Sequence, residues 1–287
     1  MVEKYFKRTP ARHERLAAIR LMRAGTILLI VALTLLLVGS LVLAIVTVIL
    51  AAGVFLHGRA ELLEYLRAHH AAEPKPSDEK MNELLQTSLD AAAERAMKRL
   101  DLSPADLALT SEEADPAGAT SDTPRLAEQG SGPLTIFGPI LDPRKQRVGA
   151  DRVWRFRSYE VMVICPTKHH LGIYECMLDM RTGTLRNEEV REYYYADVIM
   201  VSLVNTPREI ALESRNRDGS VTMGFRGIAI LDELQIVVAS GDRSEIITGI
   251  TERDTVGRPI RLQESRLDQV VASLRVLLRS KKGQRAS

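Results

Sequence analysis

Residues 24–58, AGTILLIVALTLLLVGSLVLAIVTVILAAGVFLHG, decide the class of this protein because they carry no charged side chain. A helix needs about 20 apolar residues to cross a membrane, whereas the apolar part of a cleaved secretory signal has only about 7–15. The stretch also lacks a polar face that could meet water on the surface of a soluble protein. We therefore predict a retained membrane segment at 24–58, preceded by a basic amino-terminal segment at 1–23.

Two arrangements of this membrane segment are open. A single helix of 35 residues would be about 52 Å long. That length exceeds the hydrocarbon core of about 30 Å, so the helix would tilt or protrude. A hairpin bent at Gly39-Ser40 would instead have two arms of about 16 residues, each reaching about 24 Å. Such a hairpin would be shallow or would locally thin the bilayer.

The charges on the two sides of the membrane segment predict its orientation. Residues 1–23 contain seven basic and two acidic side chains, whereas the basic residues that follow the segment are diluted by Glu61, Glu64 and Glu73. The positive-inside rule places the amino terminus in the cytoplasm, at the cell (inner) membrane. A single crossing would export the carboxy-terminal part, and a hairpin would keep it inside. We expect the cytoplasmic side for both.

A helical stalk and a linker are expected after the membrane segment. The stalk, residues 59–102, continues the membrane helix to Ala72, breaks at Pro74 and Pro76, and starts a second helix with Ser77 as N-cap. The apolar stripe of this second helix either packs on the following module or pairs with another copy. Residues 103–149, rich in Pro, Gly and acidic side chains, are predicted to be a flexible linker.

Residues 150–287 are predicted to form an antiparallel β-rich module, which makes the chain an α+β protein. Strand patterns flank turns at 166–169, 181–183, 216–219 and 240–242, and they give seven or eight short strands in meander order. The strongest strand pattern lies at 192–204, and other strands are expected near 209–214, 221–231, 234–239 and 245–250. Apolar residues at helical spacing over 267–278 predict a closing amphipathic helix with a basic outer face.

The segments VMVICPTKHHLGIYECML, EYYYADVIMVSLV and SRLDQVVASLRVLLRSKK carry a resemblance to a known architecture. A meander capped by one carboxy-terminal helix resembles the pleckstrin-homology-like barrel, and the order of apolar segment first and module last is similar to that of membrane-anchored bacterial proteins with such domains. The resemblance covers roughly the last 140 residues and carries no ligand residues over. It implies a binding or scaffolding module more than an enzyme.

The four residues Cys165, His169, His170 and Cys176 are the candidates for metal or thiol chemistry. Their spacing, C-x3-H-H-x5-C, does not match the close pairs of structural zinc sites, so we expect no metal and no cofactor. With a turn at 166–169 the two cysteines lie too far apart for a disulfide. The same register places Cys165 across from His170, so an enzyme with a Cys–His nucleophile is one alternative.

A basic run around Trp154 supplies candidate contacts to anionic lipid. These contacts are Arg144, Lys145, Arg147, Arg152, Arg155 and Arg157. The net charge of +2 gives no global basic field, so we expect no nucleic-acid partner. The expected partners are the bilayer and a protein partner or a second copy.

These features predict a non-enzymatic, membrane-anchored binding or scaffolding protein whose β-rich module engages a protein partner or anionic lipid. A structural subunit of a membrane assembly, which oligomerises through its helices, is the other non-enzymatic alternative.

Overall fold

The computed structural model describes residues 2–7, 9–107, 132–142, 146–215, 221–252, 261–265 and 267–283. The chain divides into two compact units, residues 1–76 with 214–223 and residues 77–213 with 224–287. Each unit is described by itself. Most of the predicted linker, residues 108–131, and the predicted turn at 216–219 lie outside the described residues.

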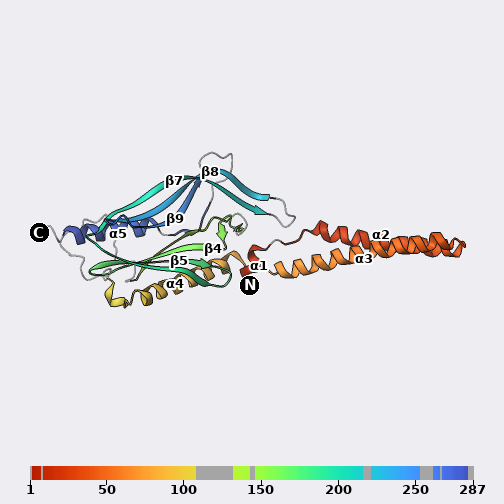
Figure 1. Ribbon diagram of the computed structural model, residues 1–287, viewed down its shortest axis with the longest axis horizontal. Helices are drawn as coiled ribbons and strands as arrows, with labels where there is room; N and C mark the ends of the chain where they lie inside the picture. The colour runs from red at the N-terminus through yellow and green to blue at the C-terminus, as the bar shows by residue number, and fades with distance from the viewer. Residues whose placement is uncertain are drawn as a thin grey trace. The chain divides into compact units, whose positions relative to one another are not determined.

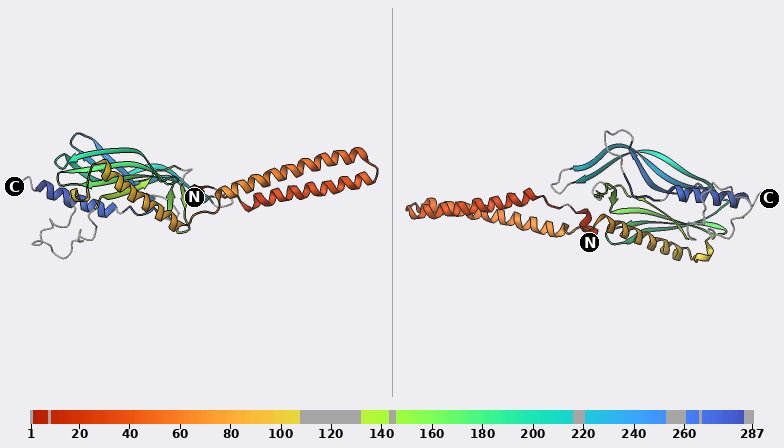
Figure 2. Two further views of the ribbon diagram at one scale, coloured as in Figure 1. Left: turned by 90° about the horizontal axis from the view of Figure 1, so that it is seen from below. Right: turned by 180° about the vertical axis from the view of Figure 1, so that it is seen from behind.

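The first unit contains two long apolar helices, α2 (Arg12–Leu37) and α3 (Leu41–Ala72), which run side by side as a hairpin (Figures 1 and 2). The chain reverses at Val38–Ser40, where Gly39 adopts a φ of +86° that favours glycine. The hairpin alternative is therefore confirmed and the single helix over 24–58 is wrong. Both arms are longer than predicted, because they include charged residues on either side of the apolar block.

Small residues at every seventh position allow the two helices to approach closely. The buried residues of the pair are Ala18, Gly25 and Ala32 on α2, and Ala44, Ala51, Gly58 and Ala72 on α3. A Cβ added to Gly58 would lie 2.9 Å from the backbone nitrogen of Met22. A seven-residue period keeps one narrow face in contact along the whole pair, as in antiparallel coiled coils.

The amino-terminal helix α1 (Val2–Phe6) closes the open end of the hairpin. Lys4 Nζ donates a hydrogen bond of 2.6 Å to the carbonyl oxygen of Glu73, the residue that ends α3. The Thr9 hydroxyl donates to the carboxylate of Glu73 at 2.9 Å, and Lys75 Nζ donates to the carbonyl oxygen of Lys7 at 2.7 Å. These bonds place the chain's start beside the end of α3.

The second unit begins with α4 (Asp78–Arg99), whose N-cap is Ser77 as predicted: the Ser77 hydroxyl accepts a hydrogen bond from the Lys80 backbone. Its apolar stripe is buried against a sheet of its own chain and contacts β4 (Ser158–Pro166) and β5 (His170–Asp179). The stripe was expected either to pack on the following module or to pair with another copy, and in the structure it packs on the module. Arg95 and Arg99 also bind the carboxylate of Glu188 on β6.

The sheet under α4 has four antiparallel strands in the order β1-β4-β5-β6. They are β1 (Leu134–Pro139), β4 (Ser158–Pro166), β5 (His170–Asp179) and β6 (Thr184–Tyr194). The predicted hairpin is confirmed, but its turn lies at Thr167–His170, slightly beyond the expected 166–169. The predicted turn at 181–183 is also present, with Gly183 at a φ of +67°.

Two strands lie inside the range predicted to be a linker, 103–149. Strand β1 pairs with β4 along its whole length, and β2 (Gln146–Val148) pairs with β3 (Trp154–Phe156) in a small separate sheet. The linker prediction is wrong for these residues because LTIF, a short apolar run, is stabilised by pairing with a strand far along the chain. Gly138 of β1 also approaches β9 (Arg243–Glu252) so closely that an added Cβ would overlap the carbonyl oxygen of Ile247.

The described residues on either side of 108–131 lie at neighbouring positions of the second unit. A short 3₁₀ turn, η1 (Pro104–Asp106), is followed by Leu107, which forms a β-bridge with Thr167 at the β4–β5 turn. On the other side Leu134 pairs with Ile164, three residues before Thr167. Both flanks of 108–131 are therefore held by the same end of one sheet.

The third sheet contains β7 (Val198–Arg215), β8 (Val221–Val238) and β9 (Arg243–Glu252) in chain order. The strand predicted over 192–204 is wrong, because a turn at Tyr195–Asp197 divides it between two sheets. The segments predicted at 221–231 and 234–239 belong to one strand, β8, with a register shift at Asp232/Glu233. The predicted turn at 240–242 is present, with Gly241 at a φ of +90°.

The core of the second unit lies between the two larger sheets and the closing helix α5 (Leu267–Gly283), as Figure 1 shows. The predicted apolar face of α5 is buried there through Val270, Val271, Leu274 and Leu277. The unit is α+β, with α4 on the outer face of the four-stranded sheet and α5 on its inner face. The described strands form three antiparallel sheets and no closed barrel, so the pleckstrin-homology-like resemblance stays a prediction.

Candidate functional site

Arg155, one of the predicted lipid contacts, is buried and fully engaged inside the second unit. Its side chain is 2 % exposed, and its guanidinium lies 2.6 Å from Asp151 and 3.7 Å from Asp78 at the start of α4. It also donates to the side-chain oxygen of Asn82 on α4 at 3.0 Å. The hydrogen bond from Arg155 lowers the pKa of Asp151. Arg155 therefore fastens α4 to the β2–β3 hairpin and is not available to lipid.

The other members of the predicted basic run do not form one surface with it. Arg144 and Lys145 lie outside the described residues, Arg147 and Arg157 are partly buried, and Arg152 is exposed in a turn. Trp154, which was expected to accompany these cations, is 1 % exposed. Arg147 lies directly opposite Arg155 in the β2–β3 pair, so the burial of Arg155 and Trp154, and not strand alternation, breaks up the run.

The Cys/His group is spread over the β4–β5 hairpin. Cys165 pairs with Gly172 and not with His170 as predicted, because the turn is displaced towards Lys168 and His169. His170 contacts the Thr167 hydroxyl at 3.2 Å. Both cysteines are free, and the described residues contain no group of three or more His, Cys, Asp or Glu side chains placed to hold a metal ion.

Burial suppresses the reactivity of both thiols. The Cys165 side chain is fully buried beneath α4, with its Sγ 3.9 Å from the sulfur of Met97. Burial raises the pKa of Cys165 to about 12 and that of Cys176 to about 11. A nucleophilic cysteine needs a lowered pKa and an adjacent base, and neither condition holds at Cys165.

A groove between the start of β7 and the outer face of α5 is the candidate binding site of the second unit. It has a volume of about 530 Å³. Its lining is formed by Val198, Ile199, Met200, Val201, Arg275, Leu278, Arg279 and Lys282. The floor is apolar, and all three charged residues of the lining are basic.

The two sides of this groove are held together by Lys282, whose Nζ donates a hydrogen bond of 2.6 Å to the carbonyl oxygen of Val198. Ile199 is 60 % exposed and Met200 is 45 % exposed, and Arg275 and Arg279 are also exposed. The groove therefore presents apolar and cationic side chains to the same ligand. An amphiphilic anion satisfies both, because its charge pairs with arginine and its apolar part covers the floor.

The sequence predicts one of the two sides of this groove. The basic outer face of 267–278 was recognised, but its neighbour across the groove was assigned to the middle of one continuous strand over 192–204. The run Val198–Val201 is apolar at four consecutive positions, a pattern that is consistent with burial of both strand faces, whereas the structure leaves Ile199 and Met200 exposed. Only the tertiary contact with α5 shows which cations lie beside it.

Most of the exposed large apolar side chains among the described residues lie on the outer surface of the α2–α3 hairpin. Leu37 is 80 % exposed and Val38 is 79 % exposed, whereas the small residues Ala18 and Gly25 lie inside. The hairpin therefore exposes its large apolar side chains and buries its small ones. This distribution is the reverse of that in a pair of helices from a soluble protein. The helices are also long and apolar enough to cross a membrane.

Comparisons of this chain with family models, with curated proteins and with solved structures found no match. The function proposed below therefore rests on the geometry of the hairpin and of the groove.

Proposed function

We propose that this chain is a membrane-anchored binding protein whose β-rich unit engages anionic lipid through the groove between β7 and α5. The observation that carries the anchor is the inverted distribution of side chains on the hairpin. Each large apolar side chain that leaves water contributes roughly 1.5–3 kcal/mol, and a hairpin with this outer surface is therefore far more stable in hydrocarbon than in water.

The geometry of the hairpin supports the proposal that the residues before α2 and those after α3 lie on the same side of the membrane. The bonds between Lys4 and Glu73 hold the start of α2 and the end of α3 at the same end of the first unit. The basic residues of 1–23 lie at that end and favour the cytoplasmic face. We therefore propose that the second unit is cytoplasmic.

The groove supports anionic lipid as the ligand through its combination of charge and apolar surface. A basic residue near an anionic membrane contributes about 1 kcal/mol, and exposed Ile199 and Met200 can enter the interfacial region beside it. A protein partner with an acidic, apolar segment is the competing occupant, and the second experiment below distinguishes it.

The proposal contains no catalytic step. The raised pKa of Cys165 and its pairing with Gly172 weigh against the Cys–His nucleophile alternative.

Membrane extraction tests the anchor. Membranes from cells expressing the full chain are washed with high salt and then with alkaline carbonate before sedimentation. We expect the chain to stay in the pellet through both washes and to enter the supernatant only with detergent. Release by either wash overturns the proposed anchor.

Nanodisc experiments test the groove. The full chain is reconstituted into nanodiscs of phosphatidylcholine alone or with a quarter of phosphatidylglycerol, and amide hydrogen exchange is followed at 198–201 and 270–282. We expect exchange there to slow several-fold with the anionic lipid in the wild type, but not in the Arg275→Gln/Arg279→Gln variant. The matched Arg147→Gln/Arg152→Gln variant should behave as wild type.

Equal exchange in both kinds of nanodisc overturns lipid binding by the groove and leaves a protein partner as its occupant. Loss of protection in Arg147→Gln/Arg152→Gln instead would return the lipid site to the basic run predicted from the sequence.

A further inference from the structure

We infer that the α2–α3 hairpin enters the bilayer from one side and that its turn, Leu37–Leu41, ends inside the membrane instead of reaching the opposite aqueous face. The inference rests on the proposed membrane anchor, and it specifies the lipid environment of the turn.

The charge-free length of each arm is short compared with the membrane. The uncharged part of α2, Ala24–Leu37, has 14 residues and spans about 21 Å, and that of α3, Leu41–Gly58, has 18 residues and spans about 27 Å. The hydrocarbon core is about 30 Å thick. A fully crossing hairpin would therefore draw Arg23 below the headgroups on the entry side.

The register of the pair makes this limit sharper. A Cβ at Gly25 would lie 3.0 Å from the carbonyl oxygen of Ala51, and one at Gly58 would lie 3.0 Å from that of Ala18. Because Gly25 also lies against Phe55 and Gly58 against Met22, these contacts place Arg23 deeper than Arg59, near the level of Phe55. The shorter charge-free arm, that of α2, therefore limits how deeply the hairpin can enter hydrocarbon without burying a charged side chain.

The turn lacks the residues that normally anchor a segment at the far interface. No charged residue, Trp or Tyr occurs anywhere in 24–58, and Ser40 is the one hydroxyl residue between Thr34 and Thr47. Aromatic and basic side chains are the usual anchors at both interfaces of a spanning segment. At this turn Leu37, Val38 and Val42 are instead 80 %, 79 % and 74 % exposed, and hydrocarbon is the medium that suits them.

The backbone of the turn satisfies much of its own hydrogen bonding, which a turn in hydrocarbon requires. The N–H groups of Val38, Gly39 and Ser40 donate to the carbonyl oxygens of Thr34, Leu36 and Leu35. The neighbouring threonine hydroxyls are also paired within their own helices, because Thr34 donates to Val31 and Thr47 donates to Leu43.

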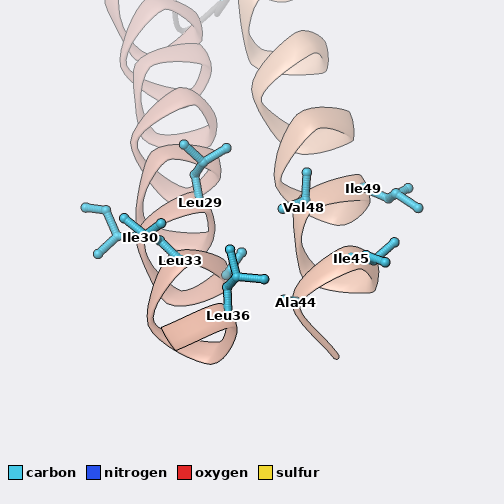
Figure 3. Close-up of a pocket in the computed structure, with 9 residues that line it drawn as sticks. Leu29, Ile30, Leu33, Leu36, Ala44, Ile45, Val48 and Ile49 are labelled. Atoms are coloured by element: carbon cyan, nitrogen blue, oxygen red, sulfur yellow. The ribbon is translucent and has the colours of Figure 1, made fainter. Parts of the chain in front are cut away.

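An apolar groove beside the turn is suited to an acyl chain. Figure 3 shows side chains from the end of α2 and the start of α3 around it, all of them aliphatic. The groove has a volume of about 450 Å³ and is lined by Leu29, Ile30, Ala32, Leu33, Leu36, Ala44, Ile45, Val48 and Ile49. All charged groups of the hairpin lie towards the other end, and the hydroxyl groups of Thr34 and Thr47 near the turn are hydrogen-bonded within their own helices.

Cysteine labelling tests the depth of the turn. Ser40→Cys and, as a second variant at the turn, Val42→Cys are introduced into the full chain, with Glu64→Cys as a reference near the base of the hairpin. Sealed right-side-out and inside-out membrane vesicles are treated with a membrane-impermeant maleimide. The unmodified chain, whose Cys165 and Cys176 are buried, supplies the background.

We expect Glu64→Cys to be labelled from one side only, and the turn cysteines to be labelled at least tenfold less than Glu64→Cys from either side until detergent is added. Labelling of the turn from the side opposite to Glu64→Cys shows a complete crossing and overturns the inference while the anchor stands. Labelling of the turn from the same side as Glu64→Cys, or recovery of the chain in the soluble fraction, overturns the anchor itself.

Charge substitution gives a second readout that does not depend on reactivity. Ser40→Lys is compared with Ser40→Thr for the amount of carbonate-resistant protein. We expect a several-fold smaller amount for Ser40→Lys, because a lysine at the turn would lie in hydrocarbon. Equal amounts would mean that the turn reaches water, and the inference would then fail.

Discussion

Gly25 of α2 lies against Ala51 of α3 so closely that a Cβ on Gly25 would be 3.0 Å from the Ala51 carbonyl oxygen. The same Cβ would lie 2.9 Å from the backbone nitrogen of Phe55. Because both contacts involve backbone atoms, the two helices must separate to admit any side chain at position 25.

Replacement of Gly25 by leucine should destabilise the hairpin, and Gly53→Leu is its matched control. A Cβ at Gly53 has no neighbour within 4 Å, so a leucine there meets no atom of the partner helix. We expect Gly25→Leu to cost about 1–3 kcal/mol, as overpacking does, and to lower the thermal midpoint in detergent micelles measured by circular dichroism. Similar midpoints for the two variants would contradict the close approach of α2 and α3.

Loss of the Arg155 guanidinium should destabilise the second unit. Arg155→Met leaves the carboxylate of Asp78, which is 14 % exposed, without its buried cation, and we expect a cost of about 3 kcal/mol. Trp154 is the single tryptophan and is buried next to Arg155, so its fluorescence reports urea unfolding of the full chain in detergent. The exposed Arg152→Met should change stability by no more than about 0.5 kcal/mol.

Acid should weaken the contact between α4 and β6. Hydrogen bonds from Arg95 and then Arg99 lower the pKa of Glu188 from 4.5 to about 2. A carboxylate with a lowered pKa stabilises the fold above its unfolded pKa and loses this contribution as the pH falls through its folded pKa. We expect the thermal midpoint of the second unit to fall between pH 4.5 and 2 in part through Glu188.

The Glu188→Gln variant should lower that midpoint at pH 7 and show a smaller change between pH 4.5 and 2 than the wild type. Glu83→Gln, which removes an exposed carboxylate paired with Lys80, is the control and should retain the wild-type pH dependence. An unchanged pH dependence in Glu188→Gln would refute the contribution of this contact.

The Cys165 thiol should react only when the second unit opens. With its pKa raised to about 12, the thiolate fraction at pH 8 is about one in ten thousand, and α4 also covers the sulfur. We expect reaction with a disulfide reagent to be at least a hundredfold slower in the native chain than in urea, whereas Ser240→Cys in the exposed turn should react rapidly. Rapid native modification of Cys165 would revive the catalytic alternative.

Local patterns in the sequence predict those elements whose signal lies within a few residues. The bend at Gly39, the N-cap Ser77 and the apolar face of α5 are all such signals, and each corresponds to an observed feature. The hairpin of β4 and β5 belongs to the same group because its strands adjoin in sequence.

Contacts between distant segments account for what the sequence did not predict. Strand β1 is defined by its pairing with β4 and by the approach of Gly138 to Ile247, more than 100 residues later. The burial of Arg155 depends on Asn82, which is 73 residues earlier. High β-propensity on both sides of Tyr195–Asp197 concealed the turn there, and this turn places Val198–Val201 beside α5.

The bridge of Leu107 to Thr167 and the pairing of Leu134 with Ile164 have a consequence for proteolysis. A protease that cuts within 108–131 would leave both fragments in one folded body, because α4 in the amino-terminal fragment is packed on strands of the carboxy-terminal fragment. Such a nick would therefore leave the β-rich unit joined to residues 1–107. A cut in the short peptide between Glu73 and Ser77 would instead break the covalent link between α3 and α4.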